Sequence, residues 1–329
     1  MSSRLSLIDF ATIQANQPFG EAFADSVRLA QKAEETGRFE RIWYAEHHNM
    51  PNIASSATSV LIAHVASQTS TIRLGAGGIM LPNHSPLVIA EQFGTLEALH
   101  PGRIDLGLGR APGTDQTTVR ALRRDPRSSD RFPEDVQELQ AFLSGDSVVP
   151  GVEAIPGKGS NVPLYILGSS LFGAQLAAAL GLPYSFASHF APEALEVAVA
   201  AYRRQFQPSE QHSEPYVIAA VNAVAADTAE EARQIHDQVL RRRVASLVAR
   251  NPAFRDHEFT EAEIDTLLDS PAGRQARGML RYVAVGGRDE VAQYLEQFRE
   301  QADADEVMIA PHGLSVEQTL RTIEILGEV

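Results

Sequence analysis

The segment that decides the fold runs from Thr71 to Gly109 and reads TIRLGAGGIMLPNHSPLVIAEQFGTLEALHPGRIDLGLG. Its first and last parts are short apolar runs, which predict β-strands. The part between them predicts a helix, because Ser85 supplies an N-cap and Pro86 fits the first helical position. Pro101 and Gly102 end that helix. A strand, a helix and a second strand in this order predict two parallel strands of one sheet.

The same alternation of strand and helix extends over the whole chain. Six further apolar segments predict strands: residues 4–10, 41–45, 162–168, 184–188, 215–226 and 305–310. Together with the two strands of the opening segment they make eight, each followed by a helix. Eight such units in a chain of this length predict a single α/β domain over residues 1–329, folded as a (β/α)8 TIM barrel.

Two insertions interrupt this regular pattern. The first follows strand 4, from residue 110 to about residue 161, and contains a predicted helix at residues 133–145. The second follows helix 7 and covers residues 251–275, which are polar and irregular in period. We interpret the second as an insertion or a mobile lid. The basic run LRRRVASLVAR that precedes it is interpreted as an exposed helix surface.

Composition excludes several classes of function. The chain has 329 residues and no cysteine, which excludes disulfides, thiol nucleophiles and cysteine-ligated metals. Its formal net charge of −14 argues against a nucleic-acid partner or an anionic membrane surface. The first residues lack the apolar region of a signal peptide, and no apolar run is long enough to span a membrane. We therefore expect a cytoplasmic enzyme.

Titratable residues follow the second predicted strand, where RIWYA ends at Glu46, His47 and His48. Active sites of such barrels lie at the C-terminal ends of the strands. We interpret one histidine as a general acid or base that the carboxylate orients. The alternatives are one buried and one exposed histidine without function, or a metal site, for which the spacing is poor. Trp43 is predicted to be a core residue.

Two glycine-rich turns follow strands four and five. In GLGRAPG, Arg110 at a strand end can clamp a phosphate with two hydrogen bonds, or it can pair with Asp105 or Asp115. In LGSSLFG, a strand passes through Ser169 and Ser170 into a helix. The free N–H groups of that helix start predict a phosphate or carboxylate site, although a serine there can simply cap the helix.

These motifs resemble those of the bacterial luciferase-like flavin monooxygenase family. The resemblance covers nearly the whole chain. It rests on WYAEHHNM (residues 43–50), LGAGGIMLPNHSPLVIAEQFGTLEALHPGRIDLGLGRAPGTDQ (residues 74–116) and LGSSLFGAQLAAALGLPYSFASHFAP (residues 167–192). The family fold is a (β/α)8 barrel, in agreement with the strand count. The resemblance further implies a monooxygenase that uses reduced FMN and O2 on a small-molecule substrate.

The resemblance also implies roles for individual residues. His47 matches the catalytic histidine, which assists the reaction of reduced flavin with oxygen, and we expect Glu46 to orient it. The strand-three residues Ala76, Gly77 and Gly78 match a non-prolyl cis peptide beside the flavin ring. The phosphate ligands match Arg110, Gly168, Ser169 and Ser170, and His189 is expected near the ribityl chain. No metal ligand is implied.

One departure from the family limits the expected activity. Gly109 stands where the light-emitting enzymes carry a reactive cysteine, so light emission with a long-chain aldehyde is not implied. The expected partners are an NAD(P)H:flavin reductase and a second copy of the chain in a homodimer. The alternatives are an F420-dependent hydride-transfer enzyme, a non-catalytic flavin-binding protein, and a barrel that holds a metal on His47 and His48.

Overall fold

The computed structural model describes residues 3–14, 16–125, 127–254 and 257–329. Within these ranges nine strands form one parallel sheet. Their bounds are β1 (Arg4–Asp9), β2 (Phe39–Tyr44), β3 (Arg73–Met80), β4 (Ile104–Gly109), β5 (Leu164–Gly168), β6 (Tyr184–Phe186), β7 (Val217–Ala225), β8 (Val283–Gly286) and β9 (Glu306–Pro311). The helices are α1 (Phe19–Thr36), α2 (Thr58–Ala66), α3 (Pro86–Leu99), α4 (Gln116–Ala121), α5 (Phe132–Ser144), α6 (Leu171–Leu180), α7 (Leu195–Gln205), α8 (Ala229–Ala249), α9 (Glu261–Leu268), α10 (Pro271–Met279), α11 (Arg288–Gln301) and α12 (Val316–Gly327).

The sheet closes into a barrel because β6 pairs with β7 as well as with β5. The ring order is β6-β5-β4-β3-β2-β1-β9-β7, so the prediction of an eight-stranded (β/α)8 barrel is confirmed. Each of the eight predicted strands is present. The ninth strand, β8, was not predicted. It pairs only with the second half of β7, at Asn222–Ala225, and adds a short branch to the ring.

The opening segment folds as predicted into β3, α3 and β4. Pro86 occupies the first turn of α3 and Ser85 is the extended N-cap residue, but the serine side chain makes no cap hydrogen bond. The glycines let β3 and β4 approach closely. A Cβ placed on Gly107 would lie 2.3 Å from the carbonyl oxygen of Ala76, so a side chain there would clash with backbone.

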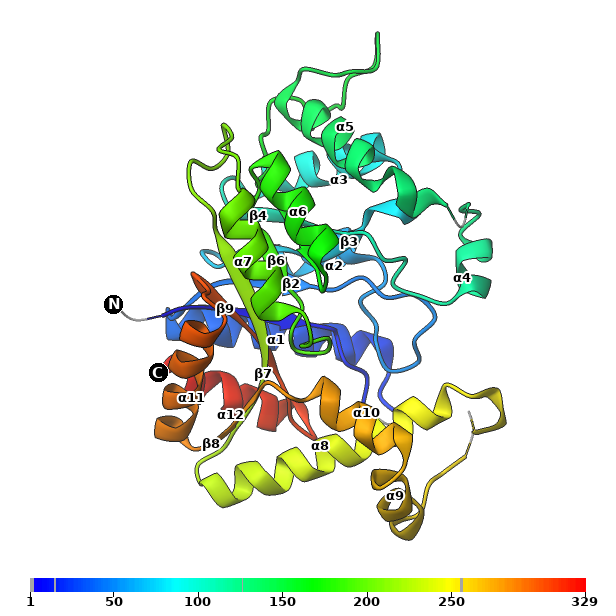
Figure 1. Ribbon diagram of the computed structural model, residues 1–329, viewed down its shortest axis with the longest axis vertical. Coiled ribbons are helices and arrows are strands. Elements are labelled where there is room, and N and C mark those ends of the chain that lie inside the picture. The colour runs from blue at the N-terminus through cyan, green and yellow to red at the C-terminus, as the bar shows by residue number, and fades with distance from the viewer. Residues whose placement is uncertain (1–2, 15, 126, 255–256) are drawn as a thin grey trace.

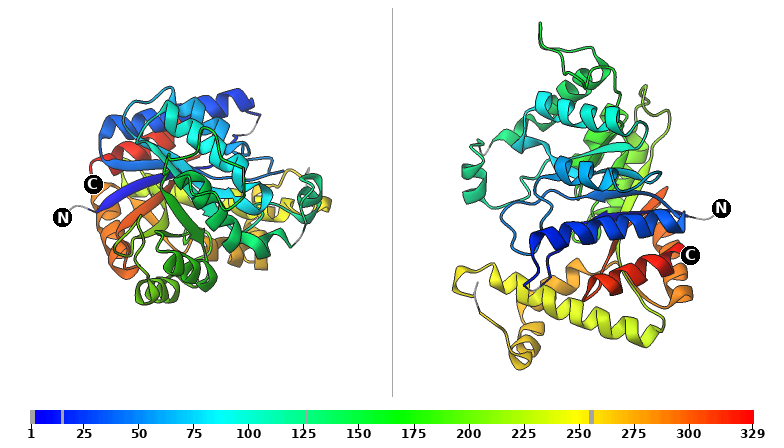
Figure 2. Two further views of the ribbon diagram at one scale, coloured as in Figure 1. Left: turned by 90° about the horizontal axis from the view of Figure 1, so that it is seen from above. Right: turned by 180° about the vertical axis from the view of Figure 1, so that it is seen from behind.

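Both insertions reach the same end of the barrel. Helix α4 of the first insertion and helices α9 and α10 of the second lie opposite the two chain termini (Figures 1 and 2). The helix predicted at residues 133–145 matches α5. The second insertion is more regular than predicted, because Thr260 and Glu263 form a capping box that starts α9. The interpretation of this insertion as a mobile lid stays a prediction.

The opposite, N-terminal end of the barrel is filled by a buried ion-pair network centred on Arg41 of β2. Its guanidinium binds Glu306 through two nitrogens, at 3.0 and 3.2 Å, and binds Asp105 at 2.8 Å. The Tyr165 hydroxyl accepts a further hydrogen bond from Arg41 at 2.7 Å. Arg41 is 7% exposed and the two carboxylates are fully buried. Above this network the barrel interior is apolar and includes Trp43, which is buried as predicted.

Candidate active site at the C-terminal end of the barrel

The predicted site residues lie where the barrel strands end. Because all strands are parallel, their C-terminal ends share one end of the barrel. The predicted residues follow or close five neighbouring strands: Glu46–His48 after β2, Gly77–Gly78 within β3, Arg110 after β4, Gly168–Ser170 at the end of β5, and His189 after β6.

Glu46 is the centre of a buried hydrogen-bond network. Its carboxylate is 1% exposed and accepts hydrogen bonds from Nε2 of His48 at 2.9 Å and from Nε2 of His84 at 2.9 Å. The Met80 backbone N–H donates to its second oxygen at 3.0 Å. Burial raises the pKa of Glu46, but these hydrogen bonds outweigh burial and lower its pKa to about 2. Glu46 is therefore ionised at neutral pH and ties the ends of β2 and β3 together.

The expectation that Glu46 orients His47 is wrong in this structure. The hydrogen-bond partners of Glu46 are His48 and His84, whereas Nδ1 of His47 lies 3.4 Å from the carbonyl oxygen of Gly113. A carbonyl only accepts, so Nδ1 carries the proton and Nε2 is left with its lone pair. Burial lowers the pKa of His47, so the ring is neutral at neutral pH. His47 and His48 contact different partners rather than a common point.

The network around Glu46 makes stability depend on pH in a defined direction. The pKa of Glu46 is about 2 in the fold and 4.5 normally, so its ionised form stabilises the fold. This contribution, up to about 3 kcal/mol, is complete above pH 4.5 and is lost as the pH falls toward 2. Urea unfolding of the wild type and Glu46→Gln should show a stability difference that narrows by about 2 kcal/mol between pH 6 and about pH 3, with the remainder lost below pH 3. A pH-independent difference would contradict this prediction.

The glycines of β3 face the neighbouring strands. The Gly77–Gly78 peptide bond is cis, at the position implied by the family resemblance. A Cβ on Gly77 would lie 2.9 Å from Cβ of Trp43, and a Cβ on Gly78 would lie 2.6 Å from the carbonyl oxygen of Gly107. Packing against β2 and β4 therefore requires glycine at both positions, whatever else the backbone contacts.

Arg110 lies beside the start of α6. Its guanidinium carbon is 4.1 Å from the ring centre of Phe172, which belongs to the first turn of that helix. Neither predicted ion pair forms: Asp105 binds Arg41 and Arg73, and Asp115 caps α4. Among the described residues no carboxylate lies within ion-pair distance of Arg110. An exposed cation thus stands next to a helix N-terminus without an acidic partner.

Ser170 is the N-cap residue of α6, but its hydroxyl does not cap the helix. The prediction that it could be a simple capping serine is therefore not supported by this geometry. The hydroxyls of Ser169 and Ser170 and the first N–H groups of α6 remain available at the same turn as Arg110. Hydroxyls, free N–H groups and a guanidinium together suit a phosphate group.

His189 borders this turn and also approaches His47. The Ala187 N–H donates to the carbonyl oxygen of Gly168 at 2.9 Å, which joins the β6 loop to the β5 turn. The His189 ring centre is 5.9 Å from that of Phe10, and Phe10 is stacked 6.1 Å from His47. His189 is 6% exposed, and burial together with nearby positive charge lowers its pKa to about 3. Its Nδ1 atom is buried and lacks a hydrogen-bond partner among the described residues.

Sequence reasoning missed three polar residues of this site: His84, Asn222 and His312. Asn222 is fully buried in β7; its amide nitrogen donates to the His189 carbonyl at 2.7 Å, and its oxygen lies 2.8 Å from Nε2 of His312. A single asparagine inside the apolar run VIAAVNAVA was a usable signal. So was His312, which directly follows β9 as His47 follows β2.

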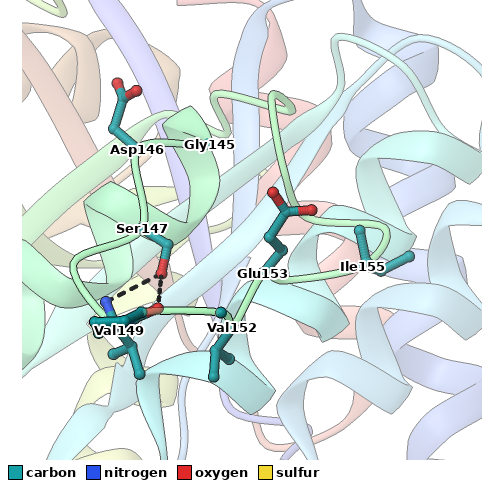
Figure 3. Close-up of a pocket in the computed structure, with 9 residues that line it drawn as sticks. Gly145, Asp146, Ser147, Val149, Val152, Glu153 and Ile155 are labelled. Atoms are coloured by element: carbon teal, nitrogen blue, oxygen red, sulfur yellow. Dashed lines mark hydrogen bonds between the residues drawn. The ribbon is translucent and has the colours of Figure 1, made fainter.

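A surface cavity of about 660 Å³ lies elsewhere, on the return loop of the first insertion (Figure 3). It is lined by nine residues between Gly145 and Ile155, and none of the predicted site residues is among them. Within it Ser147 bonds both backbone groups of Val149. The cavity is therefore separate from the candidate site.

Comparison with known proteins places the chain in one family. The profile described as luciferase-like monooxygenase matches residues 4–305. A luciferase-like monooxygenase of Escherichia coli K12 is 44% identical over 98% of this chain and 96% of its own length. The crystal structure of apo-MsnO8 superposes with a TM-score of 0.86 at 32% identity, covering 99% of this chain and 97% of that one.

A more distant structure agrees in fold. The oxygenating constituent of 3,6-diketocamphane monooxygenase from Pseudomonas putida, solved with FMN, has a TM-score of 0.73 at 15% identity, covering 100% of this chain and 97% of that one. At that identity the likeness concerns the fold alone. Within the described residues no helix combines the length and apolar character needed to cross a bilayer. The family profile and the E. coli relative establish that this chain belongs to the luciferase-like monooxygenase family.

Proposed function

We propose that residues 1–329 form a single-domain enzyme that uses reduced FMN as a cosubstrate and O2 to oxygenate a small organic molecule. The observation that carries this proposal is the position of Arg110, stacked on Phe172 beside the start of α6. A guanidinium without an acidic partner, uncapped helix N–H groups and two serine hydroxyls suit the phosphate of FMN. The membership of the chain in a monooxygenase family supports the reaction class.

The proposed cofactor residues lie on neighbouring strands and loops at the C-terminal end of the barrel. Gly168, Ser169, Ser170 and Arg110 would bind the phosphate, and His189 in the adjoining loop would border the ribityl chain. Ala76, Gly77 and Gly78 on β3 would lie beside the flavin ring. Bound reduced FMN supplies the electrons that activate O2, and the protein supplies position, shielding and proton transfer.

His47 is proposed as the proton-handling residue. Its Nδ1 hydrogen faces the Gly113 carbonyl, so the free Nε2 can accept a proton. The Phe10 ring covers one side of the imidazole, which limits access of water. Glu46 acts indirectly: it holds His48 and His84 and thereby fixes the loop that carries His47.

Binding of FMN and riboflavin to wild type and Arg110→Gln tests the phosphate site. Wild type should bind FMN more tightly than riboflavin, and the variant should lose roughly 10- to 100-fold in FMN affinity while its riboflavin affinity is unchanged. Fluorescence quenching of each flavin, oxidised and anaerobically reduced, measures these constants. Arg120→Gln, an exposed arginine on α4, is the matched control.

The same titrations separate the alternatives. Tight binding of F420 with no FMN binding would replace the proposal with hydride transfer. FMN binding combined with reoxidation of reduced FMN by O2 at the rate of free flavin would favour a non-catalytic flavin-binding protein. Equal affinities for FMN and riboflavin in the wild type would contradict the phosphate site.

Two partners are proposed. A separate NAD(P)H:flavin reductase in the cytoplasm would supply reduced FMN, and adding such a reductase with NADH should start oxygen uptake.

A second copy of the chain would cover exposed apolar residues on α2 and α3, where Val60 is 68%, Val88 43% and Leu99 63% exposed. Light scattering of the eluting protein tests the dimer, and Val60→Glu should shift it to monomer.

A further inference from the structure

Helix α8 presents a stripe of three basic residues, which we call the basic stripe. His236, Arg243 and Arg250 are spaced seven residues apart, which is two helical turns, so they share one face. Arg250 is the C-cap residue of α8 and is exposed, while His236 and Arg243 are half-buried. The interpretation of LRRRVASLVAR as an exposed helix surface is therefore wrong for Arg243, as it is for the half-buried Arg241 and the buried Val244.

Within the described part of the chain the neighbours of Arg243 have partners, whereas Arg243 has none there. Arg241 binds Asp237, Glu261 and Asp265, which ties α8 to α9. Arg242 donates to the Leu314 carbonyl. Among the described residues Arg243 makes neither an ion pair nor a side-chain hydrogen bond. Burial and the charge of Arg250 lower the pKa of Arg243, but an arginine remains charged under all ordinary conditions.

Helix α8 packs against the strand ends at the candidate site, because Ile235 and Val239 share an apolar cluster with Val224 of β7 and with Leu314 after β9. The positive charge of Arg243 acts on both His189 and His312 and contributes to lowering the pKa of each to about 3, after the larger effect of burial. The two rings are linked through Asn222, which binds the His189 carbonyl and Nε2 of His312. Arg242, the neighbour of Arg243, donates to the Leu314 carbonyl in the loop after β9, so Arg243 lies near the C-terminal ends of β7 and β9.

Among the described residues no carboxylate forms an ion pair with Arg243. The groups that act electrostatically on Arg243, His189 and His312 are arginines and histidines, within the part of the chain that the structure describes, and the arginines carry the charge at neutral pH. The chain as a whole is acidic, with a net charge of −14, so an uncompensated basic cluster at one point is a local feature. A half-buried cation without a partner is costly and is expected where a ligand supplies the counter-charge.

We infer that Arg243 binds the carboxylate of the organic substrate, so that the substrate is a small organic acid. His189 would donate through its unpartnered Nδ1 to the same carboxylate, while its ring still borders the cofactor. Arg250 would add long-range attraction for an anion. This inference rests on the proposed function, of which it specifies the substrate class.

The cofactor phosphate does not explain this second basic cluster. FMN carries one phosphate, and Arg110 with the start of α6 already provides its proposed site on β4 and β5. Arg243 belongs to α8 and lies beside His189 and His312, which follow β6 and β9. Two basic sites, one beside α6 and the other on α8, indicate two anionic groups.

Isothermal titration with alkyl carboxylates from butanoate to octanoate, and with alcohols of the same chain lengths, tests the inference. The titrations use the full chain, with and without saturating FMN. At least one carboxylate should bind the wild type, and the matching alcohol should bind at least tenfold more weakly. Arg243→Gln should weaken the carboxylate by roughly 10- to 100-fold and leave the alcohol unchanged.

Arg242→Gln is the matched control, because it removes the neighbouring arginine from the exposed face of the same helix. It should bind the carboxylate as the wild type does. Thermal unfolding checks the fold of each variant: Arg243→Gln removes an unpaired cation and should unfold at the wild-type temperature or above it. Arg243→Lys should retain part of the affinity, because lysine keeps the charge without the planar fork.

Three results would overturn the inference. These are the failure of every carboxylate to bind the wild type, equal carboxylate affinity in the wild type and Arg243→Gln, and an Arg243→Gln variant that loses affinity only for reduced FMN. The third result would mean that the Arg243 guanidinium binds the flavin rather than the substrate. Carboxylate binding that depends on Arg243 in a protein that binds no FMN would refute the proposed function but leave the anion site in place.

Discussion

Replacing Arg41 by methionine should lower the free energy of unfolding by about 3–5 kcal/mol, which is a large part of the stability of an ordinary domain. The substitution leaves Asp105 and Glu306 fully buried without their shared cation. The remaining donors, including Arg73, Tyr216 and Trp43, satisfy only part of the two carboxylates. Guanidinium chloride unfolding at neutral pH measures the loss.

Two control variants separate the buried charge from a general effect of losing an arginine. Arg28→Met breaks an exposed ion pair with Glu317 and should change stability by less than about 1 kcal/mol. Adding Glu306→Gln to Arg41→Met should restore part of the loss, because one of the two orphaned charges is removed. If the double variant is no more stable than Arg41→Met, uncompensated charge is not the cause.

Replacing His47 by asparagine should reduce the rate of substrate oxygenation by roughly 10²- to 10⁴-fold, the usual contribution of a general acid or base. Binding of FMN should stay close to that of the wild type, because the proposed phosphate residues lie on β4 and β5. The measurement is product formation and oxygen uptake with a flavin reductase, using carboxylates that bind the wild type. His64→Asn, an exposed histidine on α2, is the control.

The wild-type reaction should also depend on pH through His47. Its pKa lies below the ordinary value of 6.5 because of burial, so the neutral ring predominates at pH 7 and above. The rate should be constant there and fall as acid protonates Nε2. A rate that rises with acid would mean that the protonated ring acts instead, and equal pH profiles in wild type and His47→Asn would exclude His47 altogether.

The sequence predicts the barrel well because its strands and helices carry local signals. The turn residues Pro86, Gly102 and Gly181 stand at helix boundaries, and apolar runs alternate with amphipathic ones. The branch strand β8 carries no such signal. It has four residues of alternating burial and pairs with only part of β7, so its formation depends on tertiary contacts rather than on its own composition.

For the candidate site, the sequence indicates the region but not the pairings. Glu46 precedes His47 directly, yet its carboxylate reaches His84 from the β3 loop, because neighbours beyond a strand end point in different directions. Likewise Asp105 turns to Arg41, from another strand, rather than to Arg110. Arg243 could not be distinguished from Arg241 and Arg242 by composition, since only the register of α8 against the barrel separates them.

The two ends of β2 differ in role. Arg41, near the start of the strand, stabilises the fold, and His47, just beyond the end of the strand, belongs to the candidate site. Five residues lie between them, and the six steps from Arg41 to His47 span up to roughly 20 Å, well beyond the 7–10 Å over which mutational effects usually couple. Changes in the loops around His47 should therefore add to changes near Arg41 without amplifying them. The chemistry of such a chain can change by drift or by laboratory evolution without loss of the free energy of unfolding that the Arg41 network contributes. The loops around His47 are therefore the first places to randomise.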